Sequence, residues 1–312
     1  MKLQRRKFCT MKKIYKLSPS VHDNLWGGNK LRDYGKQSDA DRIAESWELS
    51  FVPGAEAKTE NGVILSEAFP RSAWGNNCLD FEFFPTLTKF IDAREKLSVQ
   101  VHPSDDYALR NEGQYGKTEM WYVVEADEGA GIYMGLSKTV TAEKFADMVA
   151  DGTVEDVLKF HKVKAGDVFF IPAGTVHAIG EGVLIFEVQQ NSTLTYRLYD
   201  YMRRDKDGNL RELHVDKAML VSDLSVYKPT EFAAGEVIGS CKYFEVRRCE
   251  IDGERILTVG DDSFLSISVV AGDGTVEGTR ATAGDTYFSP AGSGEIKISG
   301  ELTILAISVP KH

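Results

Sequence analysis

Short apolar or alternating runs, interrupted by Gly, Pro, Asp and Asn, follow one another along nearly the whole 312-residue chain. They lie at 46–52, 88–92, 120–124, 168–171, 183–188, 264–270, 286–289 and 302–309. Valine, isoleucine and aromatic residues recur within them, and these residue types favour strands. Many short strands separated by turn residues predict a mainly β chain built from barrels or sandwiches.

Helical periodicity is limited to a few segments between these runs. In 141–150, apolar residues recur at helical spacing, and threonines at its start resemble a helix N-cap. We also expect a helical turn at 154–160 and a short helix that begins near Leu213. The pattern therefore predicts a small helical segment within a β framework.

One ten-residue segment occurs twice. Ala165–Gly174 and Ala283–Gly292 share the pattern Ala-Gly-Asp, two aromatic or apolar residues, and Pro-Ala-Gly, with an offset of 118 residues. Such a repeat indicates two related β-barrels in tandem. We expect the division at Pro229, which would interrupt strand pairing, and hence domains of 1–230 and 231–312.

Four polar residues on strand-like segments could form a metal site. Gln100 and His102 lie on one face of an alternating run, Glu119 precedes another run, and His177 follows the turn that begins at Pro172. A single histidine in an apolar strand is more often a hydrogen-bonded core residue than a ligand. Two imidazoles and a carboxylate together, however, are a set that zinc takes in catalytic sites.

The remaining histidines do not occur with other ligand-type residues on strand-like segments. His22, His161 and His214 are interpreted as surface or structural residues. In the second copy of the repeat, Glu295 stands where His177 would be, and the only histidine after residue 230 is His312. The second domain is therefore predicted to be metal-free, with a structural or lid-like role.

Charge, hydropathy and cysteine content limit the classes of partner and the cellular compartment that fit this chain. A formal net charge of −10 argues against nucleic acid or an anionic membrane as the main partner. No apolar run approaches the roughly 18 residues that span a membrane. Four scattered cysteines indicate reduced thiols and a cytoplasmic protein. The basic first ten residues do not resemble a secretory signal, and Met11 is a second candidate start.

Taken together, these motifs resemble a known family. The segments Ser98-Val-Gln-Val-His-Pro103, Gly116-Lys-Thr-Glu119 and Pro172-Ala-Gly-Thr-Val-His-Ala178 are similar to those of the zinc-dependent, type I mannose-6-phosphate isomerases of the cupin superfamily. Further matches are Leu25-Trp-Gly-Gly28, Glu45-Ser-Trp-Glu-Leu-Ser50 and Thr195-Tyr-Arg-Leu-Tyr-Asp-Tyr201. The resemblance covers nearly the whole chain and is greatest to the short bacterial form. One departure is Met202-Arg-Arg204, where Gly-Arg is expected, so the basic residue after Asp200 that helps bind substrate is open.

The resemblance carries specific implications. It implies two tandem cupin (jelly-roll) β-barrels, the first metal-binding with a helical insertion and the second degenerate and metal-free. It implies one Zn²⁺ per chain, whose ligands are Gln100, His102, Glu119 and His177. It also implies interconversion of mannose 6-phosphate and fructose 6-phosphate through an enediol, in a monomer or homodimer. Its implied catalytic residues are Lys117, Glu187 and Arg197.

Several roles stay open at this level. Glu187 could be the general base, with Lys117 and His102 as rivals, because sequence does not show which group reaches the C1 and C2 protons. Arg197 could stabilise enediolate charge or bind phosphate, for which its geometry is suited. Lys96 and Ser98 are weaker phosphate candidates.

Two other function classes fit part of this pattern. Two histidines and one carboxylate also form the triad of ferrous oxygenases, so an iron cupin oxygenase is one alternative. The other is a metal-binding cupin that acts on another sugar, or that binds or senses a sugar without turnover. The aromatic residues beside the motifs, Trp47, Trp121 and Tyr196, are expected to be core residues rather than sugar-stacking platforms.

Overall fold

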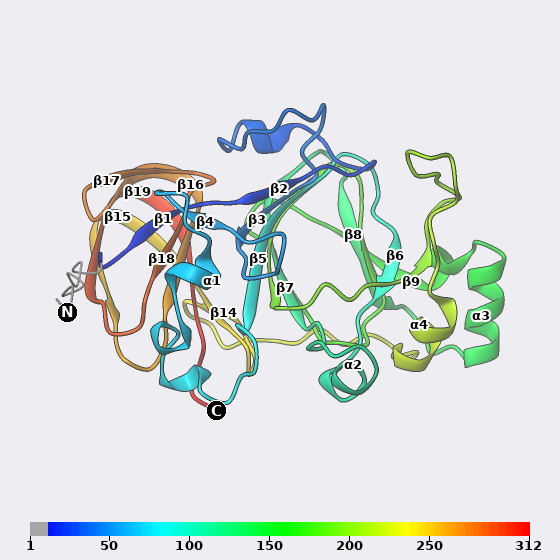
Figure 1. Cartoon of the computed structure of the whole chain (residues 1–312). Coiled ribbons are helices and arrows are strands. Elements are labelled where there is room, and N and C mark those ends of the chain that lie inside the picture. Colours follow the sequence, from blue (N-terminus) through cyan, green and yellow to red (C-terminus); the bar gives the residue numbers. More distant parts are fainter. Residues whose placement is uncertain (1–11) are drawn as a thin grey trace, which may run out of the picture.

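The computed structural model describes residues 12–312, so the question of a start at Met11 lies outside the described residues. This part of the chain is mainly β, as predicted, with strands in three sheets and four short α-helices. Figure 1 shows two β units side by side, one formed largely by the C-terminal third of the chain. Among these residues, no helix is both long and apolar enough to cross a membrane.

The first unit is a sandwich of two antiparallel sheets (Figure 1). The six-stranded sheet runs in the order β10 (Val168–Ile171), β7 (Glu119–Ala126), β12 (Val183–Gln190), β5 (Thr86–Ala93), β3 (Glu45–Leu49) and β2 (Ser20–His22). The five-stranded sheet runs β13 (Tyr196–Tyr199), β6 (Val99–Val101), β11 (His177–Ile179), β8 (Gly131–Leu136) and β9 (Leu158–Lys162). Side chains from both sheets, among them Ile91, Val123, Ile132 and Ile179, form one apolar core.

Strand β12 is buried along its whole length. Val183 and Ile185 join the core inside the sandwich, whereas Leu184, Phe186 and Val188 join a second core with residues of the C-terminal unit. A strand covered on both faces reads as a continuous apolar run, which explains the sequence 183–188. The six-stranded sheet is thus the middle layer of the molecule.

The helices agree with the sequence in part. Helix α3 (Ala142–Ala150) begins after Thr141, whose hydroxyl accepts the Lys144 N–H at 3.2 Å, and α4 (Val215–Val221) lies near its expected place. The helical turn expected at 154–160 is wrong in its second half. A 3-10 turn (Val154–Val157) passes directly into strand β9, because Phe160 pairs with Tyr133 of β8. Helices α1 (Leu65–Ala68) and α2 (Asp105–Asn111) were not predicted.

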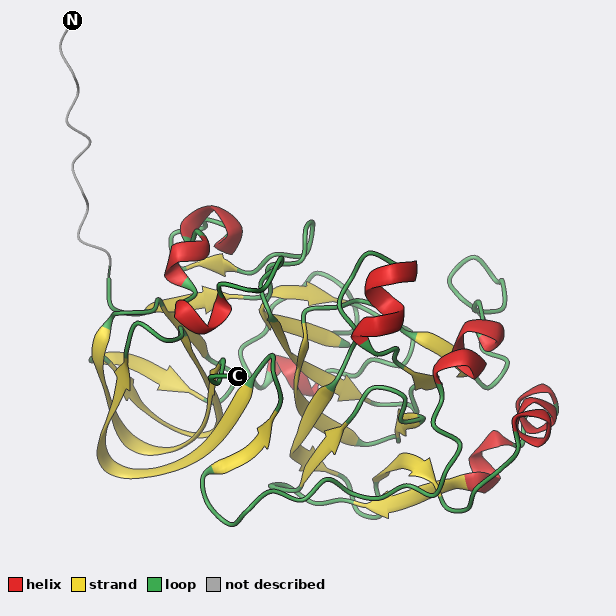
Figure 2. Cartoon of the chain, turned by 90° about the horizontal axis from the view of Figure 1, so that it is seen from below, coloured by secondary structure: helices red, strands yellow, loops and turns green. Residues whose placement is uncertain are grey.

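The C-terminal unit is one curled sheet. Its order is β14 (Val237–Ser240), β15 (Glu245–Val259), β19 (Gly294–Ser308), β16 (Leu265–Val276), β18 (Thr286–Ser289), β1 (Tyr15–Ser18) and β4 (Lys58–Thr59), with β17 (Thr279–Thr282) paired to β16. Figure 2 shows the long strands bending around their own interior, which holds Ile267, Val269, Ile296 and Ile304. Strands β1 and β4 come from the N-terminal part of the chain, which the sequence did not indicate.

The two copies of the repeat form the same turn. Asp167 and Asp285 each accept, through the side chain, the N–H of the residue three positions before, at 3.0 and 2.9 Å. The carbonyls of the same two aspartates accept the N–H groups of Val123 in β7 and Val269 in β16, both at 2.9 Å. Strands β10 and β18 are therefore equivalent, as are β7 and β16.

Candidate active site

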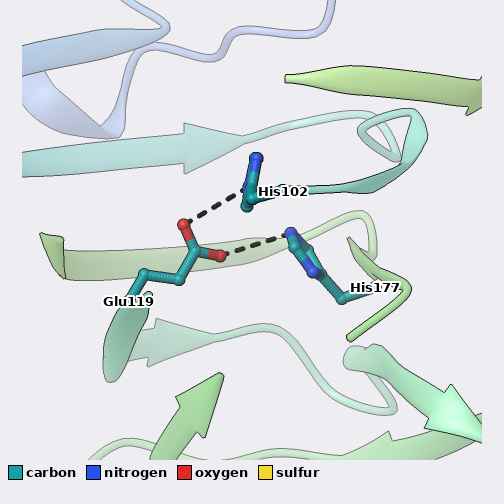
Figure 3. A group of neighbouring side chains, drawn as sticks. All are labelled: His102, Glu119 and His177. Atoms are coloured by element: carbon teal, nitrogen blue, oxygen red, sulfur yellow. Dashed lines mark ion pairs between the residues drawn. The ribbon is translucent and has the colours of Figure 1, made fainter. Parts of the chain in front are cut away.

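His102, Glu119 and His177 meet between the two sheets of the sandwich (Figure 3). Glu119 begins β7 of one sheet, while His177 begins β11 and His102 follows β6 of the other. One ligand atom from each lies within 4.8 Å of the others, and all three side chains are buried. Among residues 12–312, no other group of three His, Cys, Asp or Glu residues meets in this way.

Both imidazoles present an unprotonated nitrogen to this point. His102 Nδ1 lies 2.8 Å from the Leu194 carbonyl and His177 Nδ1 lies 2.9 Å from the Thr175 carbonyl, so each Nδ1 donates. This leaves the Nε2 lone pairs 3.5 and 3.2 Å from oxygens of Glu119. Acceptor atoms that face one another in a buried site call for a cation, and a backbone partner on the distal nitrogen is usual for metal-binding histidine.

The electrostatics of the three groups agree with this reading. Burial lowers the pKa of His177 to about 4 and that of His102 well below its ordinary value. Burial also raises the pKa of Glu119, and its Oε1 lacks a hydrogen-bond donor. A divalent ion would compensate these buried groups, so the residues fit the metal that the sequence indicates.

Gln100 lies beside this cluster. Its strand position pairs directly with His177, and its amide nitrogen lies 3.3 Å from His177 Nε2. The amide is therefore within reach of the same point as the three buried ligands.

A row of side chains crosses the six-stranded sheet next to the cluster. Strand register aligns Trp47, Lys89, Glu187 and Trp121 on β3, β5, β12 and β7. Glu187 accepts a hydrogen bond from the Trp121 indole at 3.0 Å and faces Lys89 at 3.4 Å. Burial favours the neutral acid, but the neighbouring lysines outweigh it and lower the pKa of Glu187. This direction favours the ionised form of its buried carboxylate.

Lys117 links the row to the ligand cluster. Its ammonium contacts a Glu119 oxygen, lies 3.2 Å from His102 Nε2, and lies 3.6 Å from Glu187. The structure therefore brings together Lys117, Glu187 and the three buried residues predicted as ligands from the sequence. Lys89 was missed, although a lysine in the apolar run 86–93 was a signal. Its partner is known only once strands 98 residues apart are paired.

Arg197 belongs to the opposite sheet. It pairs with Gln100, so Arg197, Gln100 and His177 form a second row on β13, β6 and β11. One guanidinium nitrogen donates to the Glu212 carbonyl at 2.7 Å, whereas the buried Nε lacks an acceptor. Burial, together with Arg211 and Arg203, lowers the pKa of Arg197. The Arg197 guanidinium therefore keeps an N–H group that is free to bind an anionic group.

Two further arginines lie near Arg197. Arg203 and Arg211 both pair with the carboxylate of Asp200, the latter at 3.2 Å. Lys96 is instead engaged by Glu155 at 3.1 Å. The charges of Arg203 and Arg211 both act on Arg197, whereas no such effect of Lys96 is found.

The aromatic residues are buried or partly buried structural residues, as expected, and two of them also support charged groups. Trp121 packs edge-on against His177 at 5.3 Å, besides its bond to Glu187. The Trp47 indole donates to Glu45 at 2.7 Å and lies under the Lys89 ammonium. Tyr196 donates to Glu112 at 2.8 Å, outside the ligand cluster.

Comparison with known proteins gives consistent matches. Residues 14–129 match the family described as phosphomannose isomerase type I, catalytic domain, and residues 236–309 match mannose-6-phosphate isomerase, cupin domain. Mannose-6-phosphate isomerase ManA of Bacillus subtilis is 36% identical over 299 residues, which span 90% of this chain and 94% of that protein. The Streptococcus mutans mannose-6-phosphate isomerase is also 36% identical, over 93% and 96%. The crystal structure of the Bacillus subtilis mannose 6-phosphate isomerase superposes with a TM-score of 0.85 at 32% identity, covering 95% of this chain and 99% of that one.

Proposed function

The chain belongs to the type I mannose-6-phosphate isomerases, and we propose that the site between its two β-sheets is where this isomerisation takes place on one zinc ion. The reaction interconverts mannose 6-phosphate and fructose 6-phosphate, an aldose and a ketose. The observation that carries the site assignment is the meeting of two unprotonated imidazole nitrogens with a buried carboxylate.

His102, Glu119 and His177 are the proposed zinc ligands, and Gln100 supplies a weaker fourth. Three strong protein ligands and a weak, exchangeable fourth leave a coordination position for water or substrate. When bound, zinc supplies Lewis-acid polarisation of a sugar oxygen. The donor set suits zinc, and it also suits iron. The assay below distinguishes the two metals.

Glu187 is the proposed general base. Its carboxylate is ionised and buried, and the Trp121 indole fixes its orientation, so it can take a proton from carbon without first losing one to water. Lys89 and Lys117 hold the negative charge in place on either side. Lys117 also lies within reach of the ligand cluster, where its ammonium can give a proton to a sugar oxygen.

Arg197 is proposed to stabilise the negative charge that develops on the enediol. A guanidinium held by its backbone bond, with a free buried N–H, is suited to this task because its charge needs little reorganisation during the reaction. Arg203 and Arg211 place further positive charge nearby, and we assign the phosphate end of the substrate to this side of the site. An anionic substrate is thus accommodated locally by a protein whose net charge is −10.

We place the domain division near residue 230, with the metal site in 1–230 and a metal-free unit in 231–312, whose sheet is completed by β1 and β4. Among residues 12–312, the thiols of Cys78, Cys241 and Cys249 are free, which supports a reducing, cytoplasmic setting.

The two alternative functions make different predictions. An iron oxygenase would consume oxygen, and a binding cupin would show no turnover.

The test is a coupled assay for conversion of fructose 6-phosphate to mannose 6-phosphate. We expect a chelator to abolish the rate and zinc to restore it. No isomerisation with zinc, together with oxygen consumption when ferrous iron is added, would support the oxygenase. No turnover in the folded, zinc-loaded protein would support the binding cupin.

A further inference from the structure

The turn between β14 and β15 of the C-terminal unit reaches into the catalytic unit. Tyr243, in this turn, is almost fully buried, and its hydroxyl donates to Asp105 Oδ2 at 2.7 Å. Its ring lies 5.1 Å from that of Tyr115, the residue before the segment Gly116–Glu119. The same hairpin carries Gly239, where a Cβ atom would come within 2.5 Å of the Met120 sulfur. The hairpin therefore contacts the chain on both sides of Gly116–Glu119.

Asp105 connects Tyr243 to the segment that carries Lys117 and Glu119. Its other oxygen, Oδ1, accepts the Gly116 N–H at 2.8 Å and the Gln190 side-chain N–H at 2.9 Å. The side-chain oxygen of Gln190, Oε1, in turn accepts the Thr118 N–H at 2.7 Å. Two of the four backbone N–H groups in Gly116–Glu119 are thus held by side chains tied to Tyr243.

The position of this segment matters because its neighbours leave little room. The Lys117 N–H donates to the Pro103 carbonyl at 3.0 Å, and a Cβ at Gly116 would lie 2.6 Å from the Asp105 nitrogen. Lys117 and Glu119 point from this short stretch into the site, where their contacts with His102 and Glu187 are 3.2 to 3.6 Å long. A shift of a few tenths of an ångström in the segment would change all of these contacts together.

We propose that Tyr243 is a positioning residue for the isomerisation, and that through Asp105 and Gln190 it fixes the segment Gly116–Glu119 in its productive place. The proposal gives the metal-free unit a role in catalysis that does not require it to bind metal or to move as a lid. It rests on the proposed function of Lys117 and Glu119 in the site.

The chain offers a matched pair of substitutions. Tyr243→Phe removes one hydroxyl and keeps the ring packing against Tyr115. Tyr287→Phe removes the hydroxyl of another buried tyrosine of the same unit, one that donates at 3.0 Å to the Arg280 carbonyl within that unit. We expect Tyr243→Phe to lower kcat about tenfold and to change KM less than about twofold. The variant loses the hydrogen bond to the Asp105 carboxylate, and that bond holds the segment Gly116–Glu119 without contacting substrate. Tyr287→Phe should leave kcat unchanged.

A second readout does not depend on turnover. In zinc-free protein, amide hydrogen exchange of residues 116–118 should be faster in Tyr243→Phe than in wild type or Tyr287→Phe, because the acceptors of Gly116 and Thr118 are loosened. If Tyr243→Phe does not fold, Thr86→Val provides the test, since the Thr86 hydroxyl donates to the Tyr243 carbonyl at 2.8 Å and holds the turn. The same selective loss of kcat is then expected.

The outcomes separate the two claims. An inactive or zinc-free wild-type protein would overturn the proposed function itself. An active wild type together with Tyr243→Phe that keeps both its kcat and its exchange rates at 116–118 would overturn the positioning role alone. Equal effects of Tyr243→Phe and Tyr287→Phe would also overturn it, because both would then act through stability.

Discussion

The two β units contain the same turn but differ in what surrounds it. Ile171, at the end of the repeated strand in the catalytic unit, pairs with Glu119, whereas its counterpart Ser289 pairs with Leu265. Leu265 packs against an apolar core, and Glu119 faces two histidines. The turn is therefore a scaffold feature, and chemistry depends on which side chains occupy the inward positions next to it.

The counterpart of His177 shows the same contrast. His177 is fully buried against Trp121, while Glu295 is exposed and is the second residue of the long strand β19. The catalytic unit bears the electrostatic penalty of buried Lys89, Lys117, Glu119 and Glu187, which is offset only where the charges are paired or bind an ion. The C-terminal interior avoids that penalty and can contribute stability. The following substitutions test this division of tasks.

Replacement of His102 with Ala should have the largest effect. Loss of one of three strong ligands is expected to remove zinc and to lower kcat/KM about 10⁴-fold, since Lewis-acid stabilisation is worth several kcal/mol. Metal content measured by mass spectrometry and the isomerase assay check this. His161→Ala, in which a histidine outside the site is changed, should keep both; a full metal complement in His102→Ala would contradict the ligand assignment.

Glu187→Gln should separate catalysis from metal binding. We expect kcat to fall about 10³-fold while zinc stays bound, because removal of a general base commonly costs 10² to 10⁴ and Glu187 is not a ligand. The rate of solvent hydrogen exchange into the sugar measures the same step. Glu250→Gln, an exposed carboxylate of the C-terminal unit, is the control, and an unchanged rate in Glu187→Gln would leave Lys117 or His102 as the base.

The pH dependence of stability should differ between zinc-free wild type and His177→Gln. Burial lowers the folded-state pKa of His177 from 6.5 to about 4, so its contribution is fully present above pH 6.5 and is lost as the pH falls toward 4. The wild type should therefore lose about 3 kcal/mol more of its unfolding free energy over this window than the variant. Urea unfolding of both proteins at pH 7 and pH 4 measures the difference, and parallel pH profiles would show that His177 is not held neutral.

Ile267→Ala should have the opposite profile to the site variants. Ile267 is fully buried in the C-terminal core, and truncation of such a side chain typically costs 2 to 5 kcal/mol of stability. At temperatures where the variant is folded, its zinc content and kcat should match those of wild type. Loss of zinc from folded Ile267→Ala would show that the two units are not as separate in task as their interiors indicate.

Arg197→Ala is expected to have the smallest of these effects. Loss of one charge-stabilising donor should lower kcat about 10²-fold. The unfolding free energy should change by less than about 1 kcal/mol, because the side chain is only half-buried and makes one hydrogen bond to backbone. Steady-state kinetics and urea unfolding on the same preparation check both, and an unchanged rate would place Arg197 outside the site.

The sequence by itself determined the local features. Alternation and β-branched content identified several strands, among them β5, β7, β10 and β12, and the Gly and Asp positions of the repeat identified both turns. Residue types singled out Gln100, His102, Glu119 and His177 as candidate ligands. These follow from short-range rules, since side-chain direction along a strand and turn geometry depend on neighbouring residues. The sequence likewise indicated α3, but it extended the 154–160 turn into β9, where cross-strand pairing outweighs helical spacing.

Only the tertiary structure decided which distant residues meet. Lys89 faces Glu187 because β5 and β12 pair in one register, and a shift of β12 by one residue would turn Glu187 to the opposite face of the sheet. The pairing of β1 with β18 and the reach of Tyr243 to Asp105 join parts of the chain that are 273 and 138 residues apart. Such contacts depend on the packing of whole sheets, and no local pattern encodes that packing, so the supporting residues of the site emerge only in the fold.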